Sequence, residues 1–227
     1  MFVYENKNKE LCITFKDNKP VSNPEYVIDV DTSTQSIVFN GMIINPYKTE
    51  MITEDVVFET AKEISTPVSI ELAKGVVVSI PEDTEGSGVY HVTKGGSLII
   101  NGDGIINGVG KNDYNMAIWA DGGNVTINGA TFTNVGASSS NDPEHFDLIY
   151  AKNGGTVIIN EGYFECETPK WTLNLNDSNP GKIIVRGGTF VDFDPSNAET
   201  EPGGSYNFVD TGYTVVRNAN LYTVVKE

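Results

Sequence analysis

The sequence has 227 residues, of which 31 are Asp or Glu and 15 are Lys or Arg, so its formal net charge is −16. This acidity argues against binding to nucleic acid or to an anionic membrane surface, although it is equally typical of an elongated protein kept soluble by its charge. The length allows one or two domains, and no apolar run reaches the roughly 18 residues of a membrane span.

Residues 1–50 are expected to form a small β segment. Short β-branched and aromatic runs, separated by Asn-Lys-Pro and Asn-Gly turns, predict strands at Leu11–Phe15, Tyr26–Val30 and Ser36–Phe39. So short a segment buries little core unless it docks on a partner or on copies of itself. We therefore expect an attachment or oligomerisation module, and the alternative is a small β-domain packed on the end of the next element. The opening residues lack the basic region and apolar core of a signal peptide, so none is expected.

Residues 51–65 are expected to form a helix. Thr53 can cap its N-terminus, and Val57, Ala61 and Ile64 form an apolar stripe at i, i+4 and i+7. A stack of β coils exposes unpaired strand edges at its ends, so this helix is expected to cap one end. A helical neck in a trimer is the competing interpretation, and one short stripe does not separate the two.

Residues 66–227 contain an internal repeat. Four segments share a glycine start and an alternating apolar run closed by Gly, Asn or Glu: residues 95–102, 122–129, 154–161 and 181–187. Their strands start at Leu98, Val125, Val157 and Ile183, which are 27, 32 and 26 residues apart. Self-similarity at such a period marks a solenoid.

Three short strands recur in each repeat, with no helical pattern between them. A second strand follows the turn, at residues 130–133, 162–165 and 188–191. A third strand precedes the next glycine start, at residues 89–93, 116–120, 147–151 and 171–175. This pattern indicates a parallel β-helix, because a leucine-rich repeat would show a helix or a leucine spacing. Residues 67–81 are expected to form an earlier coil, and residues 213–216 and 221–225 to close the far end.

Aligning the repeats produces columns of like residues. Two inward aliphatic columns are Leu98, Val125, Val157, Ile183 and Ile100, Ile127, Ile159, Val185. One aromatic per coil makes a third column, of Phe132, Phe164 and Phe190. Asn101, Asn128 and Asn160 share the turn position, where an inward Asn can bond the backbone of the next coil and tolerate a left-handed conformation. The expected fold class is therefore all-β, a single-stranded right-handed parallel β-helix of about five coils with three strands per coil.

Outward positions carry the information about partners. Ile99, Thr126, Ile158 and Ile184 lie between the inward columns and form a row that is mostly aliphatic. His91, Trp119 and Tyr150 stack outward if Val92, Ala120 and Ala151 point inward. A contiguous apolar strip usually marks an interface, so Ile99, Ile158, Ile184, Trp119 and Tyr150 are predicted to pack against other copies in a threefold bundle. The alternative is that an insertion folds over the aliphatic row. The larger insertions, at 108–115, 136–145 and 194–205, all lie on one flank.

Candidate catalytic groups are few. Glu165 with Glu167, and Asp192 with Asp194, are carboxylate pairs at i and i+2, which strand geometry places about 6.7 Å apart, a spacing that permits an inverting glycosidase. The chain has only two arginines, and Arg186 occupies the ladder position of the last repeat, where a structural role is expected. Such carboxylate pairs arise freely in an acidic protein, so no catalytic residue is predicted.

Metal and cofactor sites are not predicted either. Cys12 and Cys166 have no metal-binding spacing, and Cys166 is expected to be a small buried residue. His145 lies in a loop among carboxylates, where a solvated role is expected, and His91 has no partner by spacing. The Asn101–Gly104 run is similar to a calcium loop but lacks the repeated nonapeptide.

A small β segment, a short helix and coils of Gly-Gly-x-Val-x-Ile-Asn-Gly resemble the fibre and spike proteins of tailed bacteriophages. In style the chain is most similar to head-fibre proteins of crAss-like gut phages. The resemblance covers residues 50–192 at the level of fold, and the coil motif is generic to right-handed β-helices. It implies a homotrimer, an N-terminal end bound to a capsid or other virion protein, and a distal end that touches a host surface or glycan. No functional residue is carried over, because no binding motif matches.

Two functions are therefore expected to compete. The first is a non-enzymatic head or tail fibre of a virion, made in the host cytoplasm and used for structure or adhesion. The second is a carbohydrate-active β-helix enzyme, either a polysaccharide lyase, a glycoside hydrolase or a depolymerising tailspike. A bacterial surface adhesin is disfavoured, since no export signal is expected.

Overall fold

The computed structural model describes residues 49–81, 88–109, 115–138 and 146–227, together with the backbone of Lys48 and of strands β1–β5. The chain divides into two compact units, Met1–Lys48 and Thr49–Glu227. Each unit is described by itself.

The first unit contains short antiparallel strands. β1 (Phe15–Lys16) pairs with β2 (Lys19–Pro20). β3 (Ile28–Asp31), β4 (Ser36–Phe39) and β5 (Met42–Ile44) form a three-stranded sheet. The strand predicted at 36–39 is confirmed. β3 begins within the range predicted at 26–30, and β1 begins at the last residue of the range predicted at 11–15. The attachment role of this segment stays a prediction.

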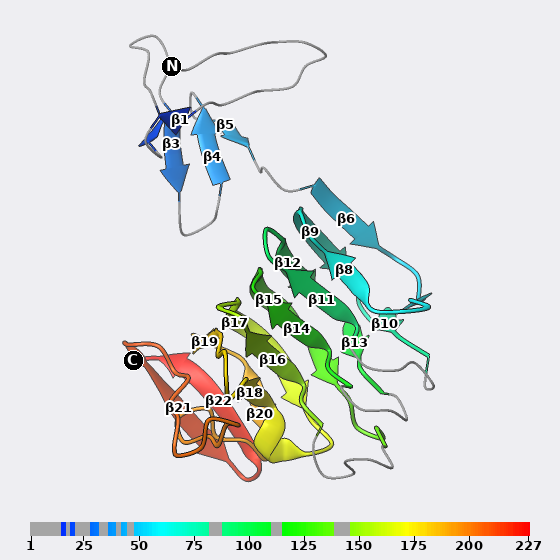
Figure 1. Cartoon of the computed structure of the whole chain (residues 1–227), viewed down its shortest axis with the longest axis vertical. Coiled ribbons are helices and arrows are strands. Elements are labelled where there is room, and N and C mark those ends of the chain that lie inside the picture. Colours follow the sequence, from blue (N-terminus) through cyan, green and yellow to red (C-terminus); the bar gives the residue numbers. More distant parts are fainter. Residues whose placement is uncertain are drawn as a thin grey trace. The chain divides into compact units, whose positions relative to one another are not determined.

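The second unit is an all-β solenoid of about four turns (Figure 1). Its strands lie in three ladders. The first ladder contains β6 (Lys48–Ile52), β9 (Pro67–Leu72), β12 (Ser97–Gly102), the first halves of β15 (Asn124–Thr133) and β17 (Thr156–Glu165), and β19 (Lys182–Val185). The second contains β7 (Val56–Val57), β10 (Val77–Ser79), β13 (Ile105–Asn107), the second halves of β15 and β17, and β20 (Thr189–Val191). The third contains β8 (Lys62–Ile64), β11 (Tyr90–Thr93), β14 (Ile118–Asp121), β16 (Ile149–Lys152) and β18 (Leu173–Leu175).

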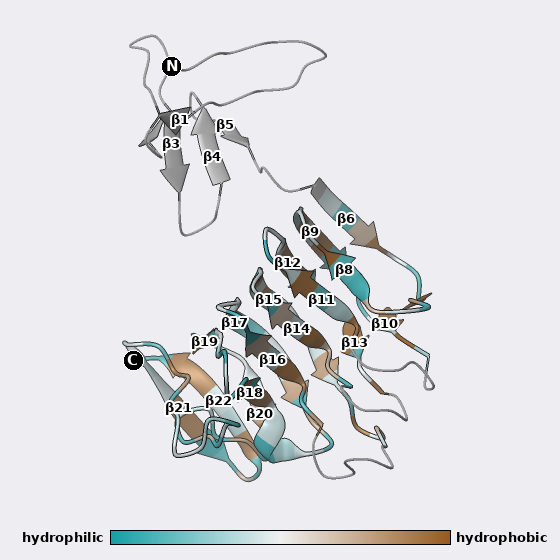
Figure 2. Cartoon of the chain, viewed as in Figure 1, coloured by the Kyte–Doolittle hydropathy of each residue, from teal (hydrophilic) through white to brown (hydrophobic). Residues whose placement is uncertain are grey.

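The core consists of the predicted columns. Strand registers pair Leu98 with Val125 and Ile100 with Ile127, one coil apart, and every member of both aliphatic columns is at most 3% exposed. Apolar segments therefore recur on successive strands, drawn in brown in Figure 2. In the aromatic column the ring of Phe164 lies 5.0 Å from that of Phe132 and 4.7 Å from that of Phe190, nearly parallel to both. The three-column prediction is confirmed.

The predicted helix over 51–65 is wrong. This segment forms the end of β6 and all of β7 and β8, which add strands to the solenoid before the coil predicted at 67–81. Val56 and Phe58 pack against the core, whereas Val57 between them is 62% exposed. The segment thus alternates with period two, and pairing with the next coil overrides the weak helical stripe. The described residues contain no helix except one 3-10 turn, Pro169–Trp171.

An antiparallel hairpin closes the C-terminal end of the coils. β21 (Tyr213–Asn218) pairs with β22 (Leu221–Lys226), and β22 pairs antiparallel with β20. Tyr222 lies in register with Phe190, the last ring of the aromatic column. The closing strands predicted at 213–216 and 221–225 are confirmed, and β22 covers the edge that β20 would otherwise expose.

Candidate functional site

The aliphatic row lies on the outer side of the first ladder. Ile99, Thr126, Ile158 and Ile184 are in register on four neighbouring strands, and all four are half-buried between fully buried neighbours. The predicted outward orientation is confirmed. Packing of this row against other copies stays a prediction.

An asparagine ladder borders this row. Asn160 Nδ2 donates to Asn128 Oδ1 (2.8 Å), Asn128 Nδ2 donates to Asn101 Oδ1 (3.0 Å), and Asn101 Nδ2 donates to the Ile70 carbonyl oxygen (3.2 Å). The ladder was expected to point inward, but Asn101 and Asn128 are only half-buried and Asn160 is exposed. The preceding isoleucine takes the inward position on each strand, so alternation places the asparagines outside. They bond mainly to one another.

Replacement of Asn128 by alanine is expected to lower the free energy of unfolding by about 1–2 kcal/mol, because it removes one donated and one accepted hydrogen bond of this ladder. Urea unfolding followed by circular dichroism measures the change. Asn124→Ala is the matched control, since Asn124 is exposed on the same strand. Equal effects of the two substitutions would contradict a role for the ladder in stability.

His91, Trp119 and Tyr150 form a second row, on the third ladder, and their predicted register is confirmed. His91 pairs with Trp119 and Trp119 with Tyr150, while Val92, Ala120 and Ala151 are fully buried on the inner side. The His91 and Trp119 rings stack at 4.1 Å with an angle of 15°. From the following coil, Lys152 Nζ lies 4.6 Å from the centre of the Trp119 ring. Trp119 is therefore held by neighbours from both adjacent coils.

His91 has a partner that its sequence spacing did not predict. Its Nε2 lies 3.1 Å from Asp121 Oδ2, and Asn153 Nδ2 donates to Asp121 Oδ1 (2.6 Å). Burial alone would raise the pKa of the Asp121 carboxyl, but the hydrogen bonds from Asn153 and His91 and the charge of Lys152 outweigh it, so the pKa is lowered. Thr93, Asp121 and Lys152 occupy one outward row two residues after His91, Trp119 and Tyr150, and this alternation was the signal that could have found the cluster.

The contribution of Asp121 to the stability of the fold depends on pH. Because the Asp121 pKa is lower in the folded chain than its ordinary value of 3.8, the carboxylate stabilises the fold above that pH, and this stabilisation is lost as pH falls through the lowered folded value. We expect Asp121→Asn to reduce the free energy of unfolding at pH 7, and the difference from the parent to shrink below about pH 4. Urea unfolding across this range tests it. Glu199→Gln, at an exposed position, should show no such trend.

The third residue of the row is covered by the chain itself. Tyr150 is 7% exposed, and its hydroxyl donates to Glu201 Oε2 (3.1 Å) and accepts from Asn176 Nδ2 (2.9 Å). Asn174, which pairs with Tyr150 in the next coil, also donates to Glu201 (3.1 Å). Burial raises the pKa of the Tyr150 hydroxyl well above its ordinary value. The insertion at 194–205 therefore folds over this end of the second row.

One member of each carboxylate pair, Glu167 and Asp194, accepts hydrogen bonds from a turn. Strand β17 ends at Glu165, and Glu167 beyond it accepts from the Gly136 backbone N–H (2.7 Å). Asp192 has a left-handed φ of 51° after β20 has ended. Asp194 Oδ1 accepts from both the backbone N–H and the hydroxyl of Ser196. The expectation that each pair shares a strand face is therefore wrong, because each strand ends before its second carboxylate.

Both arginines make structural contacts. Arg186 Nε donates to Asp210 Oδ2 (2.8 Å), and this hydrogen bond lowers the pKa of the Asp210 carboxyl. Arg217 Nε donates to the Ala219 carbonyl oxygen, and its guanidinium lies 5.1 Å from the centre of the Tyr222 ring. The structural role expected for Arg186 is consistent with its position at the last coil.

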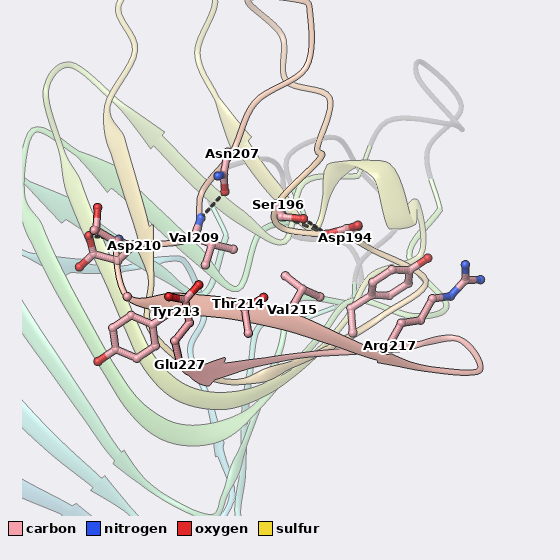
Figure 3. A pocket seen from close by; sticks show the side chains of 13 residues that line it. Asp194, Ser196, Asn207, Val209, Asp210, Tyr213, Thr214, Val215, Arg217 and Glu227 are labelled. Atoms are coloured by element: carbon pink, nitrogen blue, oxygen red, sulfur yellow. Dashed lines mark hydrogen bonds between the residues drawn. The ribbon is translucent and has the colours of Figure 1, made fainter.

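A pocket of about 650 Å³ lies between residues 194–212 and the β21–β22 hairpin (Figure 3). Figure 3 shows Asp210, Tyr213 and Glu227 at one end and Arg217 at the other. Asp194 and Asp210, two of its carboxylates, already accept the hydrogen bonds given above. Its lining contains neither His nor Cys, and its polar walls carry carboxylate, hydroxyl and amide groups.

Cys166 is 5% exposed, as expected for a buried residue, and burial raises the pKa of its thiol to about 12. Cys12 and His145 lie outside the described residues. Among the residues that are described, no three His, Cys, Asp or Glu side chains are placed to hold a metal ion. No helix in the same part of the chain has the length and apolar character to span a membrane.

Comparisons with protein families, with curated proteins and with solved structures find no match to this chain. The resemblance to bacteriophage fibres therefore stays a prediction, and the short helix that contributed to it is replaced by strands.

Proposed function

We propose that this chain is a non-enzymatic fibre subunit, a structural protein of a virion that assembles as a homotrimer through its aliphatic row. The observation that carries the proposal is the half-buried outward row in which Ile99, Ile158 and Ile184 are aligned, with Thr126 between Ile99 and Ile158. A solitary β-solenoid is expected to present mostly polar residues there, and a continuous apolar strip usually marks an interface. The insertion at 194–205, which is described in full, forms hydrogen bonds with Tyr150 and Asn174 of the third ladder.

The fold proposed for this subunit is a right-handed, single-stranded β-helix with three strands per coil, in about four turns rather than the five coils predicted. The three ladders support three strands per coil, since successive strands along the chain, such as β12, β13 and β14, enter different ladders. The right hand is supported by the coil motif.

In this proposal residues 1–50 attach the subunit to a capsid or other virion protein of a head or tail fibre, and the solenoid is used for adhesion to a host surface or glycan. The separation of the chain into the units Met1–Lys48 and Thr49–Glu227 supports an attachment segment distinct from the projecting solenoid.

An enzyme that cleaves polysaccharide is the alternative. The engagement of Glu167 and Asp194 in turns favours the fibre over it. Incubation of the full chain with polysaccharides, followed by a reducing-end assay, separates the two functions. Release of reducing ends that is lost in Glu165→Gln or Asp192→Asn would establish the enzyme.

The assembly is tested by mass photometry of the full chain, which should give three times the 24.6 kDa of one chain. Ile158→Glu should shift the population to monomers, because a charge in the row would be buried without a partner. Val216→Glu is the control, since Val216 is 53% exposed on the C-terminal hairpin, away from the row. Circular dichroism must show the same secondary structure in both variants. A parent chain that is monomeric at micromolar concentration would overturn the proposal.

A further inference from the structure

A groove of about 410 Å³ lies on the outer side of the solenoid, at the bend between the two halves of β15 and β17. Ala130, Gly162 and Gly188 have left-handed φ angles of 72°, 135° and 96°, so the chain turns sharply on successive coils. Two of the three have no side chain and the third has only a methyl group. The bend therefore forms a concave strip that crosses several coils, with a volume in the usual range for ligand sites.

One exposed aromatic ring lies in this strip. Tyr163 is 36% exposed and is in register with Thr131 on the preceding coil and with Thr189 on the following one. The Thr189 hydroxyl is 3.1 Å from that of Thr223. An apolar ring face flanked by hydroxyls suits a ligand with alternating apolar and hydroxylated surfaces.

The charges at the groove exclude an anionic ligand. Asp103 and Glu161 line it and are both exposed, and no Lys or Arg is among its lining residues. The chain as a whole carries a net charge of −16. Nucleic acids and acidic polysaccharides are therefore repelled, whereas free carboxylates are good acceptors for the hydroxyl groups of a neutral ligand.

The backbone at the groove excludes a peptide that adds as a strand. β15 lies between β13 and β17, and β17 lies between β15 and β20, so their backbone groups are already paired on both sides. Strand addition needs an unpaired sheet edge. A neutral, hydroxyl-rich ligand that bonds only to side chains of the groove is compatible with both the acidic charge and the paired backbone.

We propose that this groove binds an uncharged glycan that runs along the solenoid axis. One sugar stacks on Tyr163, and hydroxyls of neighbouring sugars bond to Thr131, Asp103 and Glu161. The strand spacing of about 4.8 Å repeats the polar groups at intervals close to the size of one pyranose ring. The inference names the ligand class for the adhesive part of the proposed function and rests on that proposal, whereas trimer assembly is measured separately.

The glycines of the bend have a structural reason of their own, since a Cβ at Gly129 would approach the Gly102 carbonyl oxygen to 2.6 Å. Close stacking of the coils therefore accounts for the concave shape of the bend. Tyr163 is different, because its side chain points outward and coil stacking does not require an aromatic ring there.

The test screens the full chain on an array of neutral and anionic oligosaccharides, and then titrates the strongest neutral binder by calorimetry. Tyr163→Ala should weaken binding at least about tenfold. Tyr206→Ala, at a tyrosine that is 37% exposed on the 194–212 segment, should bind as the parent does. Thr131→Val is a second groove variant and should weaken binding while the ring is kept.

Binding to no neutral oligosaccharide, preference for anionic ones, or unchanged affinity of Tyr163→Ala would each overturn the inference. Mass photometry of the same samples reports the oligomeric state, so loss of the glycan site can be told apart from failure of the trimer proposal.

Discussion

Replacement of Phe164 by alanine is expected to lower the free energy of unfolding by about 3–5 kcal/mol. Phe164 is fully buried and stacks on Phe132 and Phe190 from the coils on either side. Its loss leaves a cavity between two rings that are held in place by their own strands, so the neighbours can collapse only partly. Guanidinium chloride unfolding followed by circular dichroism measures the change.

The neighbouring residue supplies the control. Tyr163→Ala removes an aromatic ring from the same strand, but this ring points outward, so its effect should stay within about 0.5 kcal/mol. In a solenoid each coil contacts only its neighbours, so Phe164→Ala should also weaken the coupling between coils and lower the denaturant m value. Similar effects of the two substitutions would contradict the stacked aromatic column.

The second large effect is expected at Gly102, where substitution by alanine should cost about 4 kcal/mol. Gly102 has a φ of 92°, and a Cβ there would lie 2.1 Å from the carbonyl oxygen of Leu72 on the preceding coil. The obstacle is backbone rather than a flexible side chain, so relief requires the two coils to move apart. Thermal and urea unfolding of the variant measure the loss.

Gly75 separates the two causes of this loss. It has a similar φ of 79°, yet nothing lies within 4 Å of a Cβ built on it. Gly75→Ala should therefore show only the backbone strain, about 1–2 kcal/mol. If the two alanine variants were equally destabilised, the close approach of the coils at Gly102 would not matter, and the register of the first ladder would be in doubt.

The sequence predicts which residues of the candidate surfaces face outward. Period-two alternation in the sequence predicts that Ile99, Ile158 and Trp119 face outward, because the direction of a side chain is a local property of a strand. The partners of these residues were harder to predict. Asp121 is 30 residues from His91, and Glu201 reaches Tyr150 across 51 residues. The first contact follows from the register of β11 and β14, whereas the second depends on how the loop that carries Glu201 is folded, and loop conformation has no comparable sequence period.

The sequence by itself determined that residues 66–227 form a solenoid with aliphatic and phenylalanine columns, because a repeated alternating pattern can bury its apolar face only by stacking. Only the tertiary structure decided that residues 51–65 pair as strands, that the asparagines form an outer ladder, and that Glu167 and Asp194 serve as turn acceptors. The pairing of residues 51–65 has a clear physical cause. A weak local preference is overridden by the backbone hydrogen bonds and packing that a neighbouring coil offers, and that neighbour lies about one repeat away in the sequence.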